Sequence, residues 1–208
     1  DSSFVPAAAS DGTPIQSAMA VVDTNNGAVL AMIGGRDYTV RRGLNRATQM
    51  RRQPGSALKP LAVYGPALEL GYTTASVLLD EKTSFGGYTP RNAGDRYYGL
   101  VTMRTAIRNS LNTTAVRLLE EIGLDASIQY LNKMGIPTRN SDRNLSLALG
   151  SMTYGVTPVE LAAAYVPYAN GGIYHQPYCV ERIETVDGSN IYERKDSGKQ
   201  VLSAQNAF

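Results

Sequence analysis

The chain has 208 residues, 43% of them hydrophobic and 18% charged, so it can fold around a sizeable core as one domain or a large part of one. A net charge of +2 without long Lys/Arg runs argues against a nucleic-acid surface. No apolar stretch reaches the roughly 18 residues that a membrane span requires. One cysteine and one histidine cannot build a zinc site or a disulfide framework, so we expect no metal and no other cofactor.

The chain begins with two short apolar runs that predict a pair of antiparallel strands. They cover residues 16–23 and 28–33, and the Asn26-Gly27 step between them is a strong hairpin signal. The Gly- and Arg-rich segment 34–55 follows, and we interpret it as a loop, which at this length in a compact domain is commonly functional.

A block of helices comes next. The first is predicted over residues 56–70 and ends at Gly71. Two others, over residues 102–109 and 113–122, precede one over residues 125–134. Glycines 123 and 135 end the last two, and Asp125 is placed to cap the last.

A further helix has the clearest start signal in the sequence. "TPVE", residues 157–160, is a capping box with proline in the first helical position. After it, residues 180–194 predict a second hairpin that turns at Asp187-Gly188, and Ser203 stands where a helix cap belongs. The order of hairpin, helices and hairpin indicates an α+β fold whose sheet partners are far apart in sequence.

The two scarce residues limit the catalytic chemistry. Cys179 in "QPYCVERI" is most simply a small buried residue at the head of a strand. His175 lies in the loop-like stretch "NGGIYHQPY", which makes it a poor partner for a Ser-His-Asp site. A nucleophilic hydroxyl in this chain would therefore need a base other than histidine.

The segment "RRQPGSALKPLAVY", residues 51–64, offers such a base. Pro60 has no N–H and is tolerated only near a helix start, so the helix begins at about Ser56, where unpaired amides and the helix dipole stabilise a nearby oxyanion. Lys59 projects from the same face one turn later, and a lysine desolvated in a cleft can take a hydroxyl proton. The alternative is an ordinary Ser cap and an exposed Lys, because S-x-x-K is short enough to arise by chance.

The surroundings of this motif resemble the penicillin-binding proteins, the serine transpeptidases that cross-link bacterial peptidoglycan, and especially the bifunctional class A type. The segments that carry the resemblance, in the family's order, are "AMAVVDTNNGAVLAMIGGRDY", "NRATQMRRQPGS", "QPGSALKPLAVYGPALELGY", "YYGLVTMRTAIRNSLNTTAVRLLEEIG" and "LALGSMTYGVTPVELAAAYVPYANGGIYHQP". Together they cover roughly residues 16–208. The resemblance implies a fold like that of penicillin-binding proteins and serine β-lactamases, with an antiparallel sheet of chain-distant hairpins packed with a helical subdomain.

The resemblance also implies roles for four residues. Ser56 matches the acylated nucleophile and Lys59 the lysine that activates it. Ser110 and Asn112 match the S-x-N motif, in which the serine relays protons to the leaving group and the asparagine binds the amide side chain of the substrate. Without the surrounding match, both would be interpreted as capping residues between two helices.

The family's third motif, K-T-G or K-S-G, does not occur in the chain. "KTS" at residues 82–84 lacks the glycine and precedes the S-x-N motif instead of following it. We therefore expect residues 1–208 to be the N-terminal and central part of the transpeptidase domain, with the last sheet strands beyond residue 208 or in a second polypeptide. The resemblance also predicts a glycosyltransferase domain and a membrane anchor before Asp1, at the extracytoplasmic face of the bacterial cell membrane.

The expected function is D,D-transpeptidation of stem peptides that end in D-Ala-D-Ala, with β-lactams as acylating inhibitors. A D,D-carboxypeptidase or a serine β-lactamase would share Ser56, Lys59 and Ser110, and would pass the acyl group to water instead of an amine. A non-catalytic β-lactam- or peptidoglycan-binding module on the same fold is the alternative outside enzymes. A chain with half of its site missing could also be inactive alone.

Overall fold

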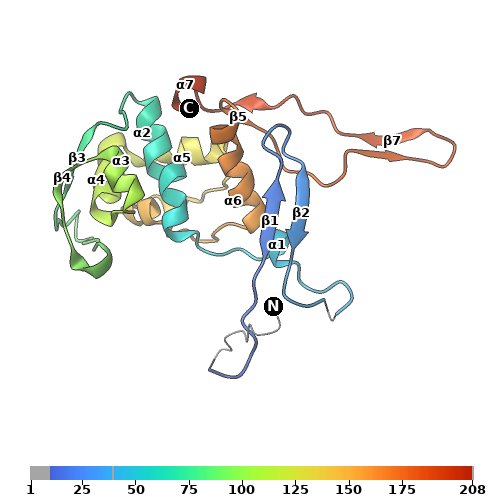
Figure 1. The fold of residues 1–208 in the computed structure, drawn as a ribbon, viewed down its shortest axis with the longest axis horizontal. Coiled ribbons are helices and arrows are strands. Elements are labelled where there is room, and N and C mark those ends of the chain that lie inside the picture. The colour runs from blue at the N-terminus through green and yellow to red at the C-terminus, as the bar shows by residue number, and fades with distance from the viewer. Residues whose placement is uncertain (1–9, 39, 208) are drawn as a thin grey trace.

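The first hairpin is present where the sequence predicts it. The computed structural model describes residues 10–38 and 40–207, and in it β1 (Met19–Val22) and β2 (Val29–Ile33) pair antiparallel (Figure 1). Gly27 in the turn has a φ of 79°, and a Cβ at this position would lie 2.7 Å from Cβ of His175. The turn therefore needs glycine for its conformation and for its close approach to the C-terminal segment.

The helix that begins near Ser56 extends as predicted, but it is not one uniform α-helix. A 3₁₀ turn over Gly55–Leu58 (η1) leads into a π-helical turn over Pro60–Tyr64 (η2), and α2 (Gly65–Glu69) completes it. The prolines explain the changes, because Pro60 and Pro66 have no N–H to donate to the preceding turn. The Ser56 carbonyl accepts from the Lys59 amide, and the Pro60 carbonyl accepts from the Gly65 amide.

The other predicted helices are confirmed. They are α3 (Met103–Arg108), α4 (Asn112–Ile122), α5 (Leu124–Lys133) and α6 (Pro158–Tyr165). The capping box of α6 forms, with the Glu160 amide donating to the Thr157 hydroxyl at 3.2 Å and the Thr157 amide donating to the Glu160 carboxylate at 2.9 Å. Ser203 precedes the short α7 (Ala204–Ala207), and its hydroxyl accepts from the Asn206 amide at 3.4 Å.

The predicted cap of α5 is wrong. Gly123, with a φ of 84°, both ends α4 and occupies the N-cap position of α5, so Asp125 already lies inside the first turn. There the carboxylate pairs with Arg143 instead of capping the helix. A single glycine between the two helices leaves no position for a separate capping residue.

Several further elements, among them a short helix and a hairpin, have no counterpart in the prediction. A single helical turn, α1 (Arg46–Gln49), lies within the segment 34–55 that the sequence indicates as loop, and the Asn45 side chain caps it. A second hairpin joins β3 (Val77–Asp80) to β4 (Gly99–Thr102) through a long connection. One turn is too short to show helical periodicity, and the long connection carries no tight-turn signal between the strands.

The strands of the described residues form four separate two-stranded antiparallel ribbons. Besides β1-β2 and β3-β4, they are β5 (Ile173–Tyr174) with β8 (Lys199–Gln200) and β6 (Arg182–Glu184) with β7 (Asn190–Glu193). The α+β class is confirmed. Within residues 10–38 and 40–207 the four ribbons do not join into one larger sheet.

The first hairpin and the C-terminal segment nevertheless touch along their backbones. The Val29 amide donates to the Tyr178 carbonyl at 2.8 Å, and the Tyr178 amide donates to the Gly27 carbonyl at 3.3 Å. Cys179 follows directly and is exposed, so the prediction that it is buried is wrong. The segment meets only the edge of the hairpin, and nothing packs over the cysteine side chain to bury it.

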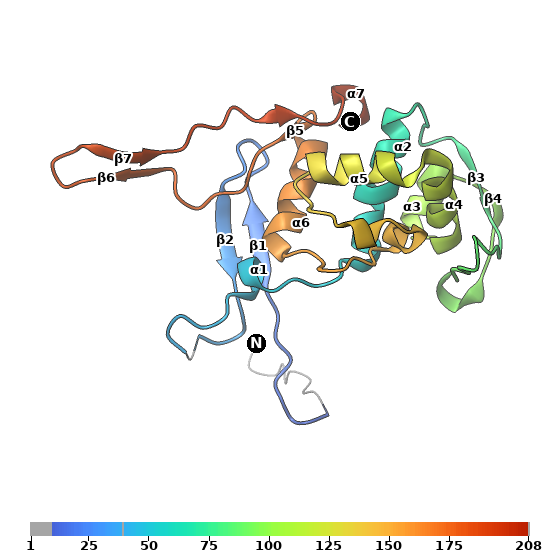
Figure 2. The same cartoon turned by 180° about the vertical axis from the view of Figure 1, so that it is seen from behind.

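The helices form a block on one side of the molecule, and this block contains the core. Seen from behind, α2, α4 and α5 lie together, with β3-β4 at the far edge and β1-β2 beside α6 (Figure 2). The fully buried leucines come mainly from the helix that carries Ser56 and from α4 and α5: Leu58, Leu61, Leu118, Leu119 and Leu131. Each such side chain stabilises the fold by about 1.5–3 kcal/mol, so the Ser56 helix is anchored in the best-packed part of the chain. No helix among the described residues is long and apolar enough to cross a membrane.

Candidate active site

Ser56 lies on the exposed surface of the 3₁₀ turn η1, at the start of its helix. Pro54 occupies the N-cap position and its side chain accepts no hydrogen bond from the turn. The first backbone amides of the helix therefore have no side-chain cap, and the helix start keeps donors beside the serine hydroxyl.

The backbone of a distant segment supports this turn. Arg52 and Val156 exchange backbone hydrogen bonds of 3.0 and 2.8 Å. A Cβ on Gly150 would lie 2.1 Å from the Gly55 carbonyl oxygen, and a Cβ on Gly155 would lie 2.2 Å from the Arg52 carbonyl oxygen. The segment 150–156 thus packs backbone against backbone with the turn that carries Ser56.

Side-chain hydroxyls bind the helix from its other sides. Tyr165 donates to the Ala57 carbonyl at 2.6 Å. The Ala62 carbonyl would meet the missing N–H of Pro66 in an α-helix, and it accepts from the Ser127 hydroxyl at 2.6 Å instead. The Ser127 hydroxyl thus satisfies the carbonyl that Pro66 leaves without a partner. Together with Tyr165, it fixes the position of the helix.

Lys59 is the buried cation of the site, with only 2% of its surface exposed. Its Nζ donates to the Ser110 carbonyl at 2.6 Å, to the Ser110 hydroxyl at 3.1 Å and to Oδ1 of Asn112 at 2.6 Å. Desolvation lowers the pKa of Lys59 to about 8. Ser110 and Asn112, which follow Lys59 by 51 and 53 positions in the chain, thus both bind its amine.

These acceptors orient the amine when it is neutral. The Ser110 carbonyl and Asn112 Oδ1 can only accept, so they hold the two N–H groups of a neutral lysine. The lone pair then points away from both carbonyl oxygens, so the amine can accept a proton from a hydroxyl on that side. The Ser110 hydroxyl lies 3.1 Å from Nζ and can donate or accept. Such an arrangement can take up a proton and pass it on.

Ser110 has an unusual backbone conformation for a serine. Its φ is 51°, in the left-handed region. The Ser110 amide donates to the Ile107 carbonyl and the Leu111 amide to the Ala106 carbonyl, both at 3.0 Å, which is a Schellman ending for α3. Glycine usually occupies this position, and a side chain there costs about 1–2 kcal/mol. The turn directs the carbonyl and the hydroxyl of one residue to Lys59.

Asn112 begins α4 and is held at both ends of its side chain. Oδ1 accepts from Lys59, and Nδ2 donates to the Arg91 carbonyl at 2.6 Å. The side-chain nitrogen carries a second hydrogen, which can donate to one more acceptor.

The remaining sequence candidates lie elsewhere. Lys82, in "KTS", is exposed on the connection after β3, and the neighbouring Thr83 accepts from Arg117 at 2.7 Å, so this sequence does not lie on a strand. His175 is buried in the C-terminal segment, with Nδ1 3.4 Å from the Asp196 carboxylate. In the part of the chain that the structure describes, no group of three or more His, Cys, Asp or Glu side chains could hold a metal.

A cavity of about 850 Å³ lies beside the nucleophile turn. The segment before β1, the residues that lead to Ser56, and α6 form its walls, including Met19, Met50, Pro54, Leu161 and Tyr165. Sequence reasoning does not find it, because its walls come from three segments far apart in the chain.

The chain is similar to known proteins in sequence and in fold. The family described as "Penicillin binding protein transpeptidase domain" matches residues 17–208. The chain is 45% identical over 188 residues to penicillin-binding protein 1F of Bacillus subtilis, covering 90% of the chain and 26% of that protein. It is 35% identical to penicillin-binding protein 1A of Escherichia coli, covering 87% and 22%. The chain thus spans about a quarter of the length of these curated relatives.

Solved structures give the same result. Penicillin-binding protein 1A from Haemophilus influenzae superimposes with a TM-score of 0.78 at 29% identity, over 96% of this chain and 36% of that one. PonA1 from Mycobacterium tuberculosis, solved in complex with penicillin V, superimposes with a TM-score of 0.80 at 25% identity, over 92% of this chain and 53% of that one.

Proposed function

Because this chain belongs to the family of penicillin-binding protein transpeptidase domains, we propose that it is a D,D-transpeptidase that cross-links peptidoglycan stem peptides through an acyl-Ser56 intermediate. One observation carries the proposal. Lys59, the residue three positions after the candidate nucleophile, is buried and held by Ser110 and Asn112, with a pKa lowered to about 8. A buried lysine with this pKa is a competent base near neutral pH.

In the proposed acylation, the Ser56 hydroxyl attacks the penultimate carbonyl of a stem peptide ending in D-Ala-D-Ala. Neutral Lys59 takes the hydroxyl proton, and the C–O bond to Ser56 forms as the peptide C–N bond breaks. The Ser110 hydroxyl, 3.1 Å from Nζ, passes a proton to the departing D-Ala amine and is reprotonated by Lys59.

The second half of the reaction reverses these transfers. An amine of a neighbouring stem attacks the acyl carbonyl and loses a proton to the site, and Ser56 leaves as its hydroxyl. We propose that the second hydrogen of the Asn112 side-chain amide binds the amide side chain of the donor peptide. The substrate lies on the extracytoplasmic face of the bacterial membrane, where we propose that the protein acts.

We also propose that β-lactams acylate Ser56. The PonA1 structure from Mycobacterium tuberculosis contains penicillin V, and this chain shares its fold at 25% identity. Opening of a β-lactam ring leaves the former leaving group tethered to the acyl chain, so it stays in the site and obstructs the second step.

Labelling of the intact protein with a fluorescent penicillin tests this function. We expect the parent to be labelled, Ser56→Ala to be unlabelled, and Ser84→Ala, a change at an exposed serine of the "KTS" segment, to be labelled like the parent. Incubation with a D-Ala-D-Ala peptide and an acceptor amine, followed by mass spectrometry, separates transfer from hydrolysis. Label on Ser56→Ala, or a parent without label, would contradict the assignment of the nucleophile, and free acid as the sole product would contradict the transferase.

A further inference from the structure

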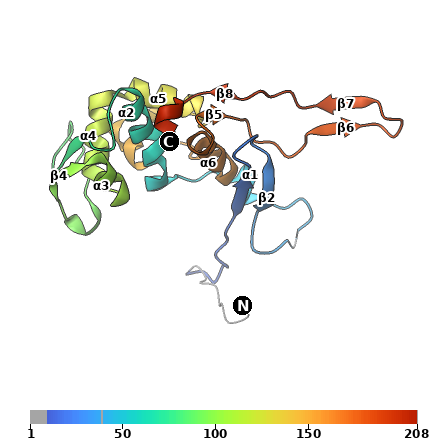
Figure 3. The ribbon, with the colours of Figure 1, turned by 45° about the horizontal axis from the view of Figure 1, so that its top comes forward.

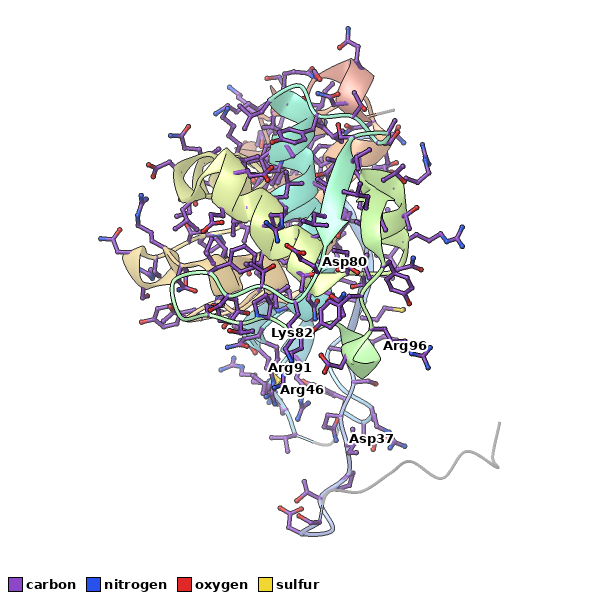
Figure 4. The ribbon with its side chains drawn as sticks, turned by 90° about the vertical axis from the view of Figure 1, so that its left-hand side faces the viewer. Asp37, Arg46, Asp80, Lys82, Arg91 and Arg96 are labelled. Carbon is purple, nitrogen blue, oxygen red and sulfur yellow. The ribbon has the colours of Figure 1, made fainter. Side chains whose placement is uncertain are left out.

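A buried polar network lies behind the S-x-N segment, and none of the steps above uses it. It begins at Asp80, the last residue of β3, which is completely buried. Figure 4 shows Asp80 at the end of this strand beside α4, with Arg91 and Arg96 on the connection that leads on to β4. A carboxylate without access to water is stable only when its oxygens are well hydrogen-bonded.

The Asp80 carboxylate is satisfied by neutral donors. Oδ1 accepts from Nδ2 of Asn92 at 2.7 Å and from the Thr113 hydroxyl, and Oδ2 accepts from the Tyr98 amide at 2.9 Å. No cation is among these partners. The carboxylate therefore fixes three groups from two segments, the connection before β4 and the first turn of α4.

Asn92, only 6% exposed, transmits this order to the catalytic residues. Its Nδ2 donates to Asp80 and to the Arg96 carbonyl at 2.9 Å, and both can only accept, so the orientation of the amide is determined. Oδ1 must then face the other way, where it accepts from the backbone amides of Asn112 at 2.7 Å and Thr113 at 3.3 Å. Leu111, at the N-cap position of α4, has no side-chain oxygen that could accept from these amides. The Asn92 side chain supplies that oxygen instead, although Asn92 precedes Asn112 by 20 residues.

Asn112 is consequently held by three groups. Its backbone amide binds Asn92, its Nδ2 binds the Arg91 carbonyl, and its Oδ1 binds Lys59. Two of the three contacts come from adjacent residues of the β3-β4 connection. The position of Oδ1 relative to the lysine amine thus depends on that connection.

We propose that Asn92 and Asp80 are positioning residues for the reaction, which hold the S-x-N segment where Ser110 and Asn112 can orient the amine of Lys59. The inference rests on the proposed function above. The β3-β4 connection would then support proton transfer at Lys59, although neither Asn92 nor Asp80 binds the lysine amine.

The test needs a structural control, and the chain contains a close match. Asp142 is 2% exposed, and its Oδ1 accepts from the hydroxyl and the amide of Thr153 at 2.6 and 2.7 Å. Its Oδ2 accepts from the Arg139 amide at 2.7 Å. This carboxylate is buried like that of Asp80 and also accepts from a hydroxyl and backbone amides, but it does not bind Asn92, Ser110 or Asn112. Because Thr153 belongs to the segment that holds the turn of Ser56, Asp142→Asn is the control for the Lys59 titration and not for the rate.

The main variant is Asn92→Leu, in which a side chain of similar size keeps water out but neither accepts nor donates. Two readouts are measured on the intact protein: the rate of acylation by a fluorescent penicillin, and the titration of Lys59 followed by NMR of its labelled Nζ. Desolvation is the dominant influence on the pKa of Lys59, and the groups bound to its amine are uncharged. Within the described residues, Asp80 is linked to the amine through Asn92 and Asn112, the Arg91 carbonyl is linked through Asn112, and the Tyr165 hydroxyl binds the Ala57 carbonyl.

We expect Asn92→Leu to slow acylation by about 10- to 100-fold, because a small misplacement of catalytic groups has effects of this size. The Lys59 pKa should fall below the parent value of about 8, since Asn112 Oδ1 no longer stabilises the ammonium form. Asp142→Asn should lower the Tm and leave the Lys59 pKa at the parent value. In Asp80→Asn, one carboxylate oxygen becomes an NH₂ group that faces the N–H or hydroxyl donors of Asp80. We expect it to slow acylation and lower the Lys59 pKa less than Asn92→Leu does. It is the variant to use if Asn92→Leu does not fold.

A parent rate and a parent Lys59 pKa in Asn92→Leu, or in Asp80→Asn when the leucine variant is unfolded, would overturn the inference. So would an equal fall of the Lys59 pKa in Asp142→Asn. The Lys59 titration requires no acylation, so a failure of the proposed function, seen as an unlabelled parent, remains distinct from a failure of the positioning role.

Discussion

Ser110 meets two conflicting demands with one residue. The end of α3 requires a left-handed conformation that favours glycine, and the site requires a hydroxyl beside Lys59. The chain keeps the hydroxyl at the expense of local strain, which is typical of functional positions.

Two substitutions separate these demands. Ser110→Ala keeps the strain and removes the hydroxyl, whereas Ser110→Gly removes both. We expect the glycine variant to have a free energy of unfolding about 1 kcal/mol above that of the alanine variant, by relief of the left-handed side chain. Both should lose acylation to a similar extent. Denaturant unfolding and penicillin labelling measure these effects, and an alanine variant as stable as the glycine variant would show that the conformation is not strained.

The pKa of Lys59 predicts a pH dependence of acylation. The base must be neutral, so the rate should rise with pH and level off above an acid limb near pH 8. The folded pKa lies below the ordinary value of 10.5, so the unfolded state binds more protons between these values, and stability should rise with pH there. Rates and unfolding free energies measured from about pH 6 to about pH 9 check both trends, because buried tyrosines such as Tyr64 and Tyr165, whose pKa is raised, oppose the rise in stability above this range. Lys59→Met should abolish this rise in stability with pH. If the rise persists in the variant, another titratable group causes it.

At the scale of elements, the nucleophile turn depends on glycine contacts more than on side-chain packing. Gly155 has a φ of 70°, and its Cα faces the backbone of Arg52. Gly188 in the β6-β7 turn has a similar φ of 87° but open space around it. The two positions differ in crowding and not in backbone conformation.

Gly155→Ala should therefore be more destabilising than Gly188→Ala. We expect about 1 kcal/mol for the conformation alone at residue 188, and at least about 3 kcal/mol at residue 155, where the backbone must also move. Only the change at residue 155 should slow acylation, because it displaces the segment that holds the turn of Ser56. Thermal melts and labelling rates compare the two variants, and equal losses of stability would mean that the contact with Arg52 relaxes freely.

Sequence patterns predict the elements that carry their own local signals. The capping box at Thr157, the hairpin turns and the glycines that end helices are all legible over a few residues, and the structure confirms them. α1 and the β3-β4 hairpin lack such signals. The same distinction holds in the site: Ser56 and Lys59 share one helix turn, but the meeting of Lys59 with Ser110 spans 51 residues and follows only from the family resemblance.

Asn92 and Asp80 show the limit of sequence reasoning more sharply. Neither belongs to a short motif that we recognised, and their importance arises from burial and from a defined amide orientation. The prediction that Cys179 is buried was wrong for a different reason. A position at the head of a predicted strand does not guarantee that other residues cover the side chain in the fold.

In the molecule as a whole, stability is concentrated in the helical block. The hairpin of β6 and β7 projects far from it (Figure 3), and every residue of both strands is exposed. Few contacts hold such a ribbon, so it should open locally at low free energy.

Limited proteolysis should therefore cut first between Glu184 and Asn190. The endoproteinase that cleaves after Glu and Asp has sites there at Glu184 and Asp187. We expect the nicked protein to keep its melting transition and its reaction with penicillin, since the core and the site lie in the helical block. Mass spectrometry of early fragments identifies the first cut, and a first cut within α4 or α5 would contradict this distribution of stability.

The backbone contacts beneath Ser56 also bear on how the protein can evolve. Main-chain atoms of residues 150–156 fix the nucleophile turn, and main-chain atoms are the same whatever the side chain. An exposed neighbour such as Ala57 can therefore be exchanged without moving the serine. If Ser56 is the nucleophile that we propose, selection by an antibiotic can change its surroundings residue by residue while Ser56 keeps its position, so that adaptation and loss of activity become separable events.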